Sequence, residues 1–223
     1  MTELYFLLVT LHVVLFAYWL GGDWGVYVCS KYIARPDLSM AERKRFLDAL
    51  MMIDILPRTG IVLLPVVGLQ MALLRGTVTI PSWVGSASLV VGAAWLAVIW
   101  TAYARRGTPF GARMTSIDIG WRAVLIVVLL AAGGWSLANG GPFQEPWVAM
   151  KLIVYAVLLV VGLYLRLAIR IWIEGFRRLA TEGPSDAINA LFIQGRERAR
   201  WAAYVFWSLV VLTGYLGIRQ PFF

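Results

Sequence analysis

The sequence predicts an all-α protein, a polytopic membrane helix bundle of six transmembrane helices, and three observations support this fold class. First, 61% of the 223 residues are hydrophobic and 14% are charged, whereas soluble proteins average about 45–50% and about 25%. Second, the mean hydropathy is +0.76. Third, six apolar stretches approach or exceed the about 20 helical residues that span a bilayer core, and they lack the alternation of barrel strands.

The six predicted spans follow one another along the whole chain. The first comes directly after Met-Thr-Glu. Because this start has no basic residues and no small-residue cleavage pattern follows, we expect the first apolar run to be kept as a span rather than removed as a signal peptide. The spans cover residues 4–30, 57–74, 83–104, 123–138, 146–165 and 201–218.

Lysine and arginine gather in alternate loops, and this pattern predicts the topology. Of the 20 basic residues, six lie between spans one and two, four between spans three and four, and seven between spans five and six. The positive-inside rule places these loops in the cytoplasm and both termini outside. We expect one transmembrane domain over residues 1–223, built of hairpins 1–75, 76–141 and 142–223, in the bacterial inner membrane with a periplasmic N-terminus. The net charge of +8 then reflects topology, and nucleic-acid binding has no support.

The counts of cysteine and histidine exclude several classes of site. One cysteine, Cys29, cannot form a disulfide within the chain. One histidine excludes zinc fingers, the zincin motif and any site that needs two histidines from one chain.

The predicted cytoplasmic loops contain further helical segments. Ser39 and Glu42 fit a capping box, and residues 40–50 then place apolar side chains on one face, so we expect this segment to lie along the membrane surface. Residues 172–179 and 187–200 resemble short interfacial or span-extending helices.

An aspartate, or in the third hairpin a glutamine, followed four residues later by arginine recurs at the start of the return span of each hairpin. This spacing brings both side chains to one helical face. The pairs either neutralise topogenic arginines or form a functional polar network, since ionisable groups at membrane depth are functional by default. They are Asp54 with Arg58, Asp118 with Arg122 and, more faintly, Gln194 with Arg198.

The first span carries a polar stripe formed by His12, Trp19 and Asp23, which fall within about 20° of one direction on a helix. His12 and Asp23 are about 16 Å apart along the axis, so they cannot share one ligand shell. His12 is either a ligand for haem iron or copper, a proton relay, or a histidine hydrogen-bonded to a neighbouring helix. Trp19 is most simply a packing residue. We expect Asp23 to be protonated or paired with Lys31 or Arg58.

Small residues flank this stripe and allow another group to approach closely. Gly21 and Gly25 form a G-x-x-x-G motif, and Gly22 adds a third small residue. They permit close contact by another helix or by a flat cofactor.

A second polar position, Lys151, lies near the outer end of span five, on the side poor in positive charge. It either extends outward to the interface or faces an anion such as a propionate at the level of His12. Met71 and Met150 lie at similar depth, and thioether sulfur binds haem iron and copper(I). A methionine in an apolar helix also serves as core.

Two motifs resemble the superfamily that joins the copper-resistance D (CopD) membrane proteins and the HemJ-type protoporphyrinogen oxidases, and above all its uncharacterised predicted integral membrane proteins. They are Leu-His-x6-Trp-x-Gly-Gly in span one and Trp-x3-Lys-Leu in span five. The resemblance implies haem b bound by His12, with Trp19, Gly22 and Lys151 at the cofactor. The chain departs from the HemJ type because Gly162 stands near the place of the second histidine and because six spans exceed the usual four.

Three functions remain open from the sequence. The leading hypothesis is an inner-membrane haem b protein with a redox or electron-transfer role and, if it is an enzyme, a haem-dependent membrane oxidoreductase. The alternative of a copper or small-substrate permease uses His12, Met71 and Met150, although the sequence has no Met-rich or His-rich run. The third is a non-catalytic subunit or assembly factor, within a homo-oligomer or larger membrane complex.

Overall fold

The computed structural model describes residues 2–221 and contains six long α-helices in that range. Each is long and apolar enough to cross a membrane, so the predicted six-helix fold class is confirmed and the protein is a multi-pass membrane protein. The helices are α1 (Glu3–Ile33), α2 (Met40–Arg75), α3 (Trp83–Ala104), α4 (Pro109–Asn139), α5 (Pro146–Glu182) and α6 (Asp186–Arg219).

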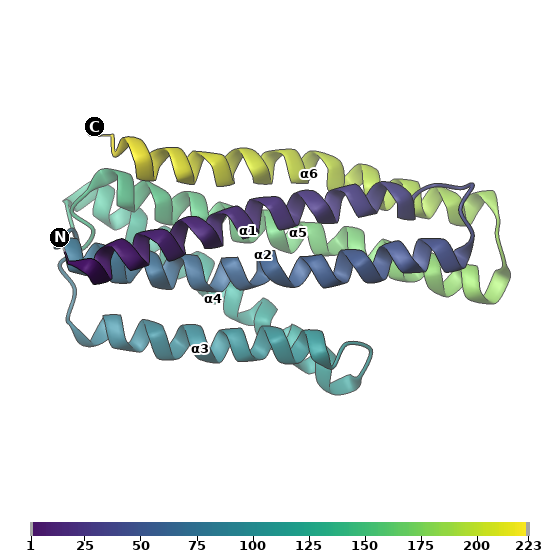
Figure 1. Ribbon diagram of the computed structural model, residues 1–223, viewed down its shortest axis with the longest axis horizontal. Helices are drawn as coiled ribbons and strands as arrows, with labels where there is room; N and C mark the ends of the chain where they lie inside the picture. The colour runs from purple at the N-terminus through teal and green to yellow at the C-terminus, as the bar shows by residue number, and fades with distance from the viewer. Residues whose placement is uncertain (1, 222–223) are drawn as a thin grey trace.

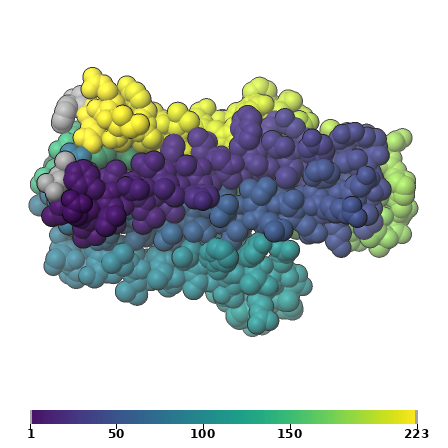
Figure 2. All heavy atoms as spheres, viewed as in Figure 1, coloured from purple at the N-terminus to yellow at the C-terminus, as the bar shows by residue number. Residues whose placement is uncertain are grey.

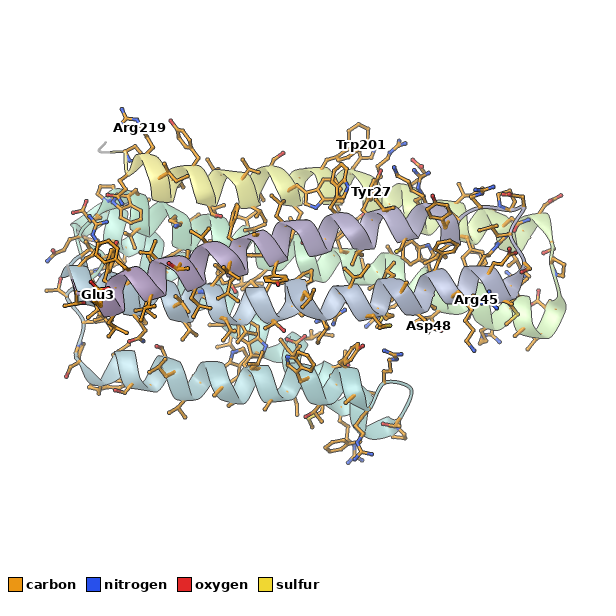
Figure 3. All side chains as sticks on the ribbon, viewed as in Figure 1. Glu3, Tyr27, Arg45, Asp48, Trp201 and Arg219 are labelled. Atoms are coloured by element: carbon orange, nitrogen blue, oxygen red, sulfur yellow. The ribbon has the colours of Figure 1, made fainter. Side chains whose placement is uncertain are left out.

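The helices form three antiparallel hairpins whose ends differ in character (Figure 1). Both termini lie at one end, which we call the terminal end, where Figure 3 labels Glu3 and Arg219. The loops 34–39, 105–108 and 183–185 lie toward the other end, which we call the basic end. The α3–α4 hairpin stops short there, while α1, α2, α5 and α6 extend further (Figures 1 and 2).

The outer surface is apolar, as expected of helices that contact lipid. Large hydrophobic side chains are exposed on every helix, for example Val90 of α3, Val127 of α4 and Val211 of α6, at 71%, 67% and 54%. A soluble protein would not expose apolar side chains so continuously. Contact with a lipid bilayer accounts for this surface.

An aromatic cluster occupies the middle of the bundle and joins four helices. Trp19 of α1 packs edge-on against Tyr155 of α5 and Phe206 of α6, with ring centroids 6.2 Å and 5.7 Å apart. The Tyr155 hydroxyl donates to the carbonyl of Ile61 in α2. Pro65 lies four residues after Ile61 and has no N–H to donate to that carbonyl, so the tyrosine satisfies an acceptor that the helix leaves free.

Helices α1 and α2 pack through glycines placed opposite large side chains. A Cβ on Gly22 would lie 2.6 Å from Cδ of Pro57, and one on Gly60 would lie 3.2 Å from Cβ of Trp19. Glycine therefore sets the distance between the two helices. Gly25 likewise faces Ile53. Of the small residues predicted to allow close approach, Gly22 and Gly25 therefore contact α2, whereas nothing lies within 4 Å of a Cβ at Gly21.

The expectation that residues 40–50 lie along the membrane surface is wrong. The capping box of Ser39 and Glu42 is present, but the helix that starts there continues to Arg75 as α2. Its apolar side chains, including Phe46 and Leu47, pack into a second core made by the ends of α1, α2, α5 and α6. Protein, rather than lipid, covers the apolar face.

Segments 172–179 and 187–200 extend α5 and α6, as one of the two sequence interpretations has it. In the second core the Trp172 indole donates to the carbonyl of Phe192 at 3.2 Å. Arg43 is buried at its edge, donates to Oδ1 of Asn189 at 2.8 Å and lies over the Phe192 ring. The basic end is thus a small four-helix bundle of its own.

The α1–α2 contact predicts a difference between adjacent glycines. Gly22→Val should lower the free energy of unfolding by about 1–3 kcal/mol, because the new side chain overlaps Pro57. Gly21→Val is the matched control, because nothing lies within 4 Å of a Cβ at that position. Thermal unfolding of the detergent-solubilised variants measures both, and equal melting temperatures would contradict this packing.

Candidate functional site

The bundle interior holds polar side chains in two groups at different depths. The first, which we call the ion-pair cluster, lies in the half nearer the basic end and comprises Asp54, Arg58, Asp118, Arg122 and Arg166. The second is the pair His12 and Lys151, in the half nearer the terminal end. The aromatic cluster around Trp19 lies between them.

Asp118 is the centre of the ion-pair cluster. Its Oδ1 accepts from Nε1 of Trp95 at 2.8 Å and from Nε of Arg122 at 3.1 Å, and its Oδ2 accepts from Arg166. Asp118 and Arg122 are each 2% exposed. One carboxylate therefore joins helices α3, α4 and α5 through charge-assisted hydrogen bonds.

The Asp54–Arg58 pair of α2 lies at the same depth. Nε of Arg58 donates to Oδ2 of Asp54 at 2.6 Å. Asp54 and Asp118 each lie 21 residues from the end of their helix at the terminal end, or about 30 Å along the axis. This distance equals the about 30 Å of a bilayer's hydrocarbon core, so the cluster lies at its boundary.

Both predicted acid–arginine pairs form, but the third member of the cluster differs from the predicted echo. Among residues 2–221, Gln194 makes no side-chain hydrogen bond to Arg198; Arg166 of α5 supplies the third guanidinium. Sequence reasoning counted Arg166 only as topogenic and missed Trp95. Arg166 lies just past the end of predicted span five, and Arg58 and Arg122 lie at the corresponding ends of spans two and four. This shared level was the sequence signal that could have placed Arg166 in the cluster.

Asp23 makes no ion pair within the described structure. Its Oδ2 is buried without a hydrogen-bond partner, as is Nε1 of Trp19 one turn away. Lys31 instead lies over the Tyr27 ring at 5.3 Å, and Arg58 bonds Asp54. The polar stripe predicted from the sequence thus faces the interior with unsatisfied polar atoms.

His12 continues this pattern in the other half of the bundle. Its Nδ1 is enclosed without a hydrogen-bond partner among the described residues, while the side chain as a whole is half-buried. Its Cε1 lies 3.4 Å from the position that a Cβ on Gly68 would occupy, so the ring faces the α2 backbone on that side. Most buried side-chain nitrogens have a hydrogen-bond partner, whereas Nδ1 of His12, like Nε1 of Trp19, has none among the described residues.

Lys151 lies near His12 and remains in the interior. Its Nζ is 5.7 Å from the centre of the Trp147 ring and 2.8 Å from the position of a Cβ on Gly217, so it lies between α5 and α6. It is close enough to His12 for its charge to act there. No carboxylate in the described part of the chain forms an ion pair with it.

The remaining predicted site residues pack in the protein. Met71 and Met150 pack against the main core. Trp19 and Gly22 belong to the contacts of α1 with its neighbouring helices. Within residues 2–221 no three His, Cys, Asp or Glu side chains are grouped to hold a metal ion. At Gly162, a Cβ would lie 3.9 Å from Nη1 of Arg122, so the ion-pair cluster adjoins this position.

In comparisons with known proteins, no family model, no curated protein and no solved structure matches this chain.

The ion-pair cluster predicts a large cost for the loss of one carboxylate. Asp118→Asn should lower the free energy of unfolding by about 3–5 kcal/mol, because Arg122 and Arg166 would stay buried without a counter-charge. Asp37→Asn removes the same charge from an exposed pair with Arg35 and should change little. Thermal unfolding in detergent compares the two, and an unshifted Asp118→Asn melting curve would refute the assignment.

Proposed function

We propose that the protein is an inner-membrane haem b protein with a redox or electron-transfer role, in which His12 is an axial ligand. The observation that carries this proposal is the unsatisfied His12 ring: it lies in the bundle interior, beside a cationic side chain, with no protein group bonded to either nitrogen in the described structure. An imidazole in this state is available as a ligand.

The residues around His12 fit haem b in donor type. Neutral imidazole supplies the nitrogen ligand, and the ammonium group of Lys151 can pair with a propionate. When bound, haem b would supply one-electron transfer at this depth of the membrane. The packing of α1 on α2 closes the side of Gly68, so the partly accessible side of the ring is the one left for a ligand. Two histidine ligands from one chain are excluded.

The orientation we propose places the terminal end in the periplasm. Its support is the distribution of charge, since 14 of the 20 basic residues belong to the loops and helix segments toward the basic end and three more, Arg58, Arg122 and Arg166, to the ion-pair cluster. His12 and Lys151 would then lie in the periplasmic half and the ion-pair cluster at the cytoplasmic boundary.

The proposal predicts a haem spectrum that depends on one side chain. Purified protein from haem-replete cells should show a Soret band, and His12→Ala should remove it or reduce it at least tenfold, because the only histidine is lost. Thr10→Ala serves as the control, because its hydroxyl bonds only the Phe6 carbonyl. Circular dichroism verifies the helical fold of each. A wild-type protein without a Soret band, or a band unchanged in His12→Ala, would sink the proposal.

A permease for copper or another small substrate is the second candidate, and the ion-pair cluster favours it. Buried ionisable groups at membrane depth mark substrate and proton pathways. Asp23 adds an unpaired carboxylate at the level of the cluster, 20 residues from the start of α1. For copper, His12, Met71 and Met150 are the ligands available in the terminal half.

Uptake measurements test the permease. If the chain carries copper, a deletion strain should accumulate less, the wild-type gene should restore uptake, and Asp23→Asn should restore less than half of it. Asp37→Asn, which removes an exposed carboxylate, should restore it fully. Unchanged cellular copper in the deletion strain would argue against copper as the substrate. Co-purification of a cofactor-free chain with a larger complex would instead favour the third hypothesis, a non-catalytic subunit.

A further inference from the structure

The loop between α3 and α4 concentrates unpaired positive charge. Arg105, Arg106 and Arg113 are exposed, and within residues 2–221 none of them forms an ion pair. The chain holds no acidic residue from 76 to 117, so the sequence supplies no local counter-ion. At the ends of α5 and α6, by contrast, arginines pair with glutamates, as Arg177 does with Glu174. The α3–α4 loop therefore carries a charge that the protein leaves uncompensated.

Two of these arginines line a hollow at the start of α4. The hollow has a volume of about 530 Å³ and is lined by Arg105, Thr108, Pro109, Phe110 and Arg113. The third, Arg106, lies over the Tyr103 ring, 5.2 Å from its centre. Arginine is well suited to phosphate because its planar donors bind two oxygens at once.

The loop that shapes this hollow is held in place by its own backbone. The Arg105 carbonyl accepts from both the N–H and the hydroxyl of Thr108, and that hydroxyl accepts from the N–H of Gly111. A Cβ on Gly111 would lie 2.1 Å from the Arg105 carbonyl oxygen, so glycine is required there. The backbone at Arg105 is thus fixed relative to α4, which carries Arg113.

An exposed apolar stripe continues from the hollow along α4 toward the terminal end. Phe110, Ile117 and Val124 are spaced by seven residues, share one face and are 51%, 48% and 63% exposed. Ile117 lies next to Asp118, at the boundary of the hydrocarbon, and Val124 lies about 10 Å further in, whereas Phe110 lies outside the hydrocarbon, at the level of the headgroups. Trp121 is exposed on the same face. Anionic headgroup contacts and acyl-chain contacts therefore follow one another on one helix.

The level of the loop agrees with a position at the bilayer surface. The other two loops toward the basic end lie beyond the four-helix extension, whereas the α3–α4 hairpin stops short of it (Figures 1 and 2). Basic pockets at such a level bind lipid headgroups.

We propose that the hollow formed by Arg105, Thr108, Phe110 and Arg113 binds the phosphate headgroup of an anionic membrane lipid, whose acyl chains lie along Ile117 and Val124. The shared chemistry is a phosphate anion, and the apolar stripe selects a lipid over free phosphate as its source. The site is remote from His12 and does not depend on the function proposed above.

The test measures lipid binding to the full chain in detergent. Phosphatidylglycerol, phosphatidylcholine with the same acyl chains, and inorganic phosphate are titrated separately, with bound lipid counted by native mass spectrometry. Wild-type protein should bind phosphatidylglycerol more tightly than the other two. R105Q/R113Q should bind it about 30-fold more weakly, from about 1 kcal/mol per basic residue.

R177Q/R178Q removes the same charge from exposed pairs on α5 and should bind like wild type. Three results would each overturn the site. They are that R105Q/R113Q binds phosphatidylglycerol as tightly as wild type, that R177Q/R178Q is weakened as much as R105Q/R113Q, or that wild type binds inorganic phosphate as tightly as phosphatidylglycerol. R105Q/R113Q should also keep the wild-type melting temperature without lipid. A fall would assign the arginines to the fold and overturn the proposal as well.

Discussion

The buried carboxylate of Asp118 is the constraint on which the arrangement of the bundle depends. Apolar helices in lipid gain little from packing against one another, because lipid tails are as apolar as their side chains. Close packing at small residues and polar contacts therefore specify which helices meet. Asp118 bonds Trp95, Arg122 and Arg166, so it fixes α3, α4 and α5 to one another. The α3–α4 hairpin lacks the second core of the longer helices. This contact attaches it to α5, while Gln70 and Thr59 of α2 form hydrogen bonds with α3.

The same cluster bears on the charge of Asp23. Its five members carry two negative and three positive charges, so an ionised Asp23 would make the layer neutral. Arg58 forms an ion pair with Asp54, and the charges of Asp118 and Asp23 also act on its guanidinium. A proton that binds to or leaves Asp23 would therefore change the net charge of the whole layer. That property is what a proton-coupled process at the membrane boundary would require.

The sequence predicted the fold well and the site partly, for different physical reasons. Hydropathy and charge report on lipid and topology, so six helices could be read directly, as could the i, i+4 pairs of Asp54 and Asp118. The role of residues 40–50 could not be predicted from the sequence, because an amphipathic helix has the same residue pattern whether lipid or another helix covers its apolar face. Arg166 and Trp95 reach Asp118 from other helices, and no local spacing encodes such a contact. The sequence placed His12, Trp19 and Asp23 on one face of α1, but the missing hydrogen-bond partners of these side chains depend on what α2 presents.

The position of His12 follows from how α2 compensates for its prolines. Pro65 frees the Ile61 carbonyl, and Tyr155 satisfies it from α5, which holds α5 against α2 one layer below His12. Gly60 and Gly68 then bring α1 so close that Trp19 and His12 lie against the α2 backbone. No polar group of α2 is within reach of the imidazole there, because glycine offers no side chain. This packing leaves Nδ1, on the edge that faces Gly68, without a hydrogen-bond partner among the described residues, while the ring as a whole stays partly accessible.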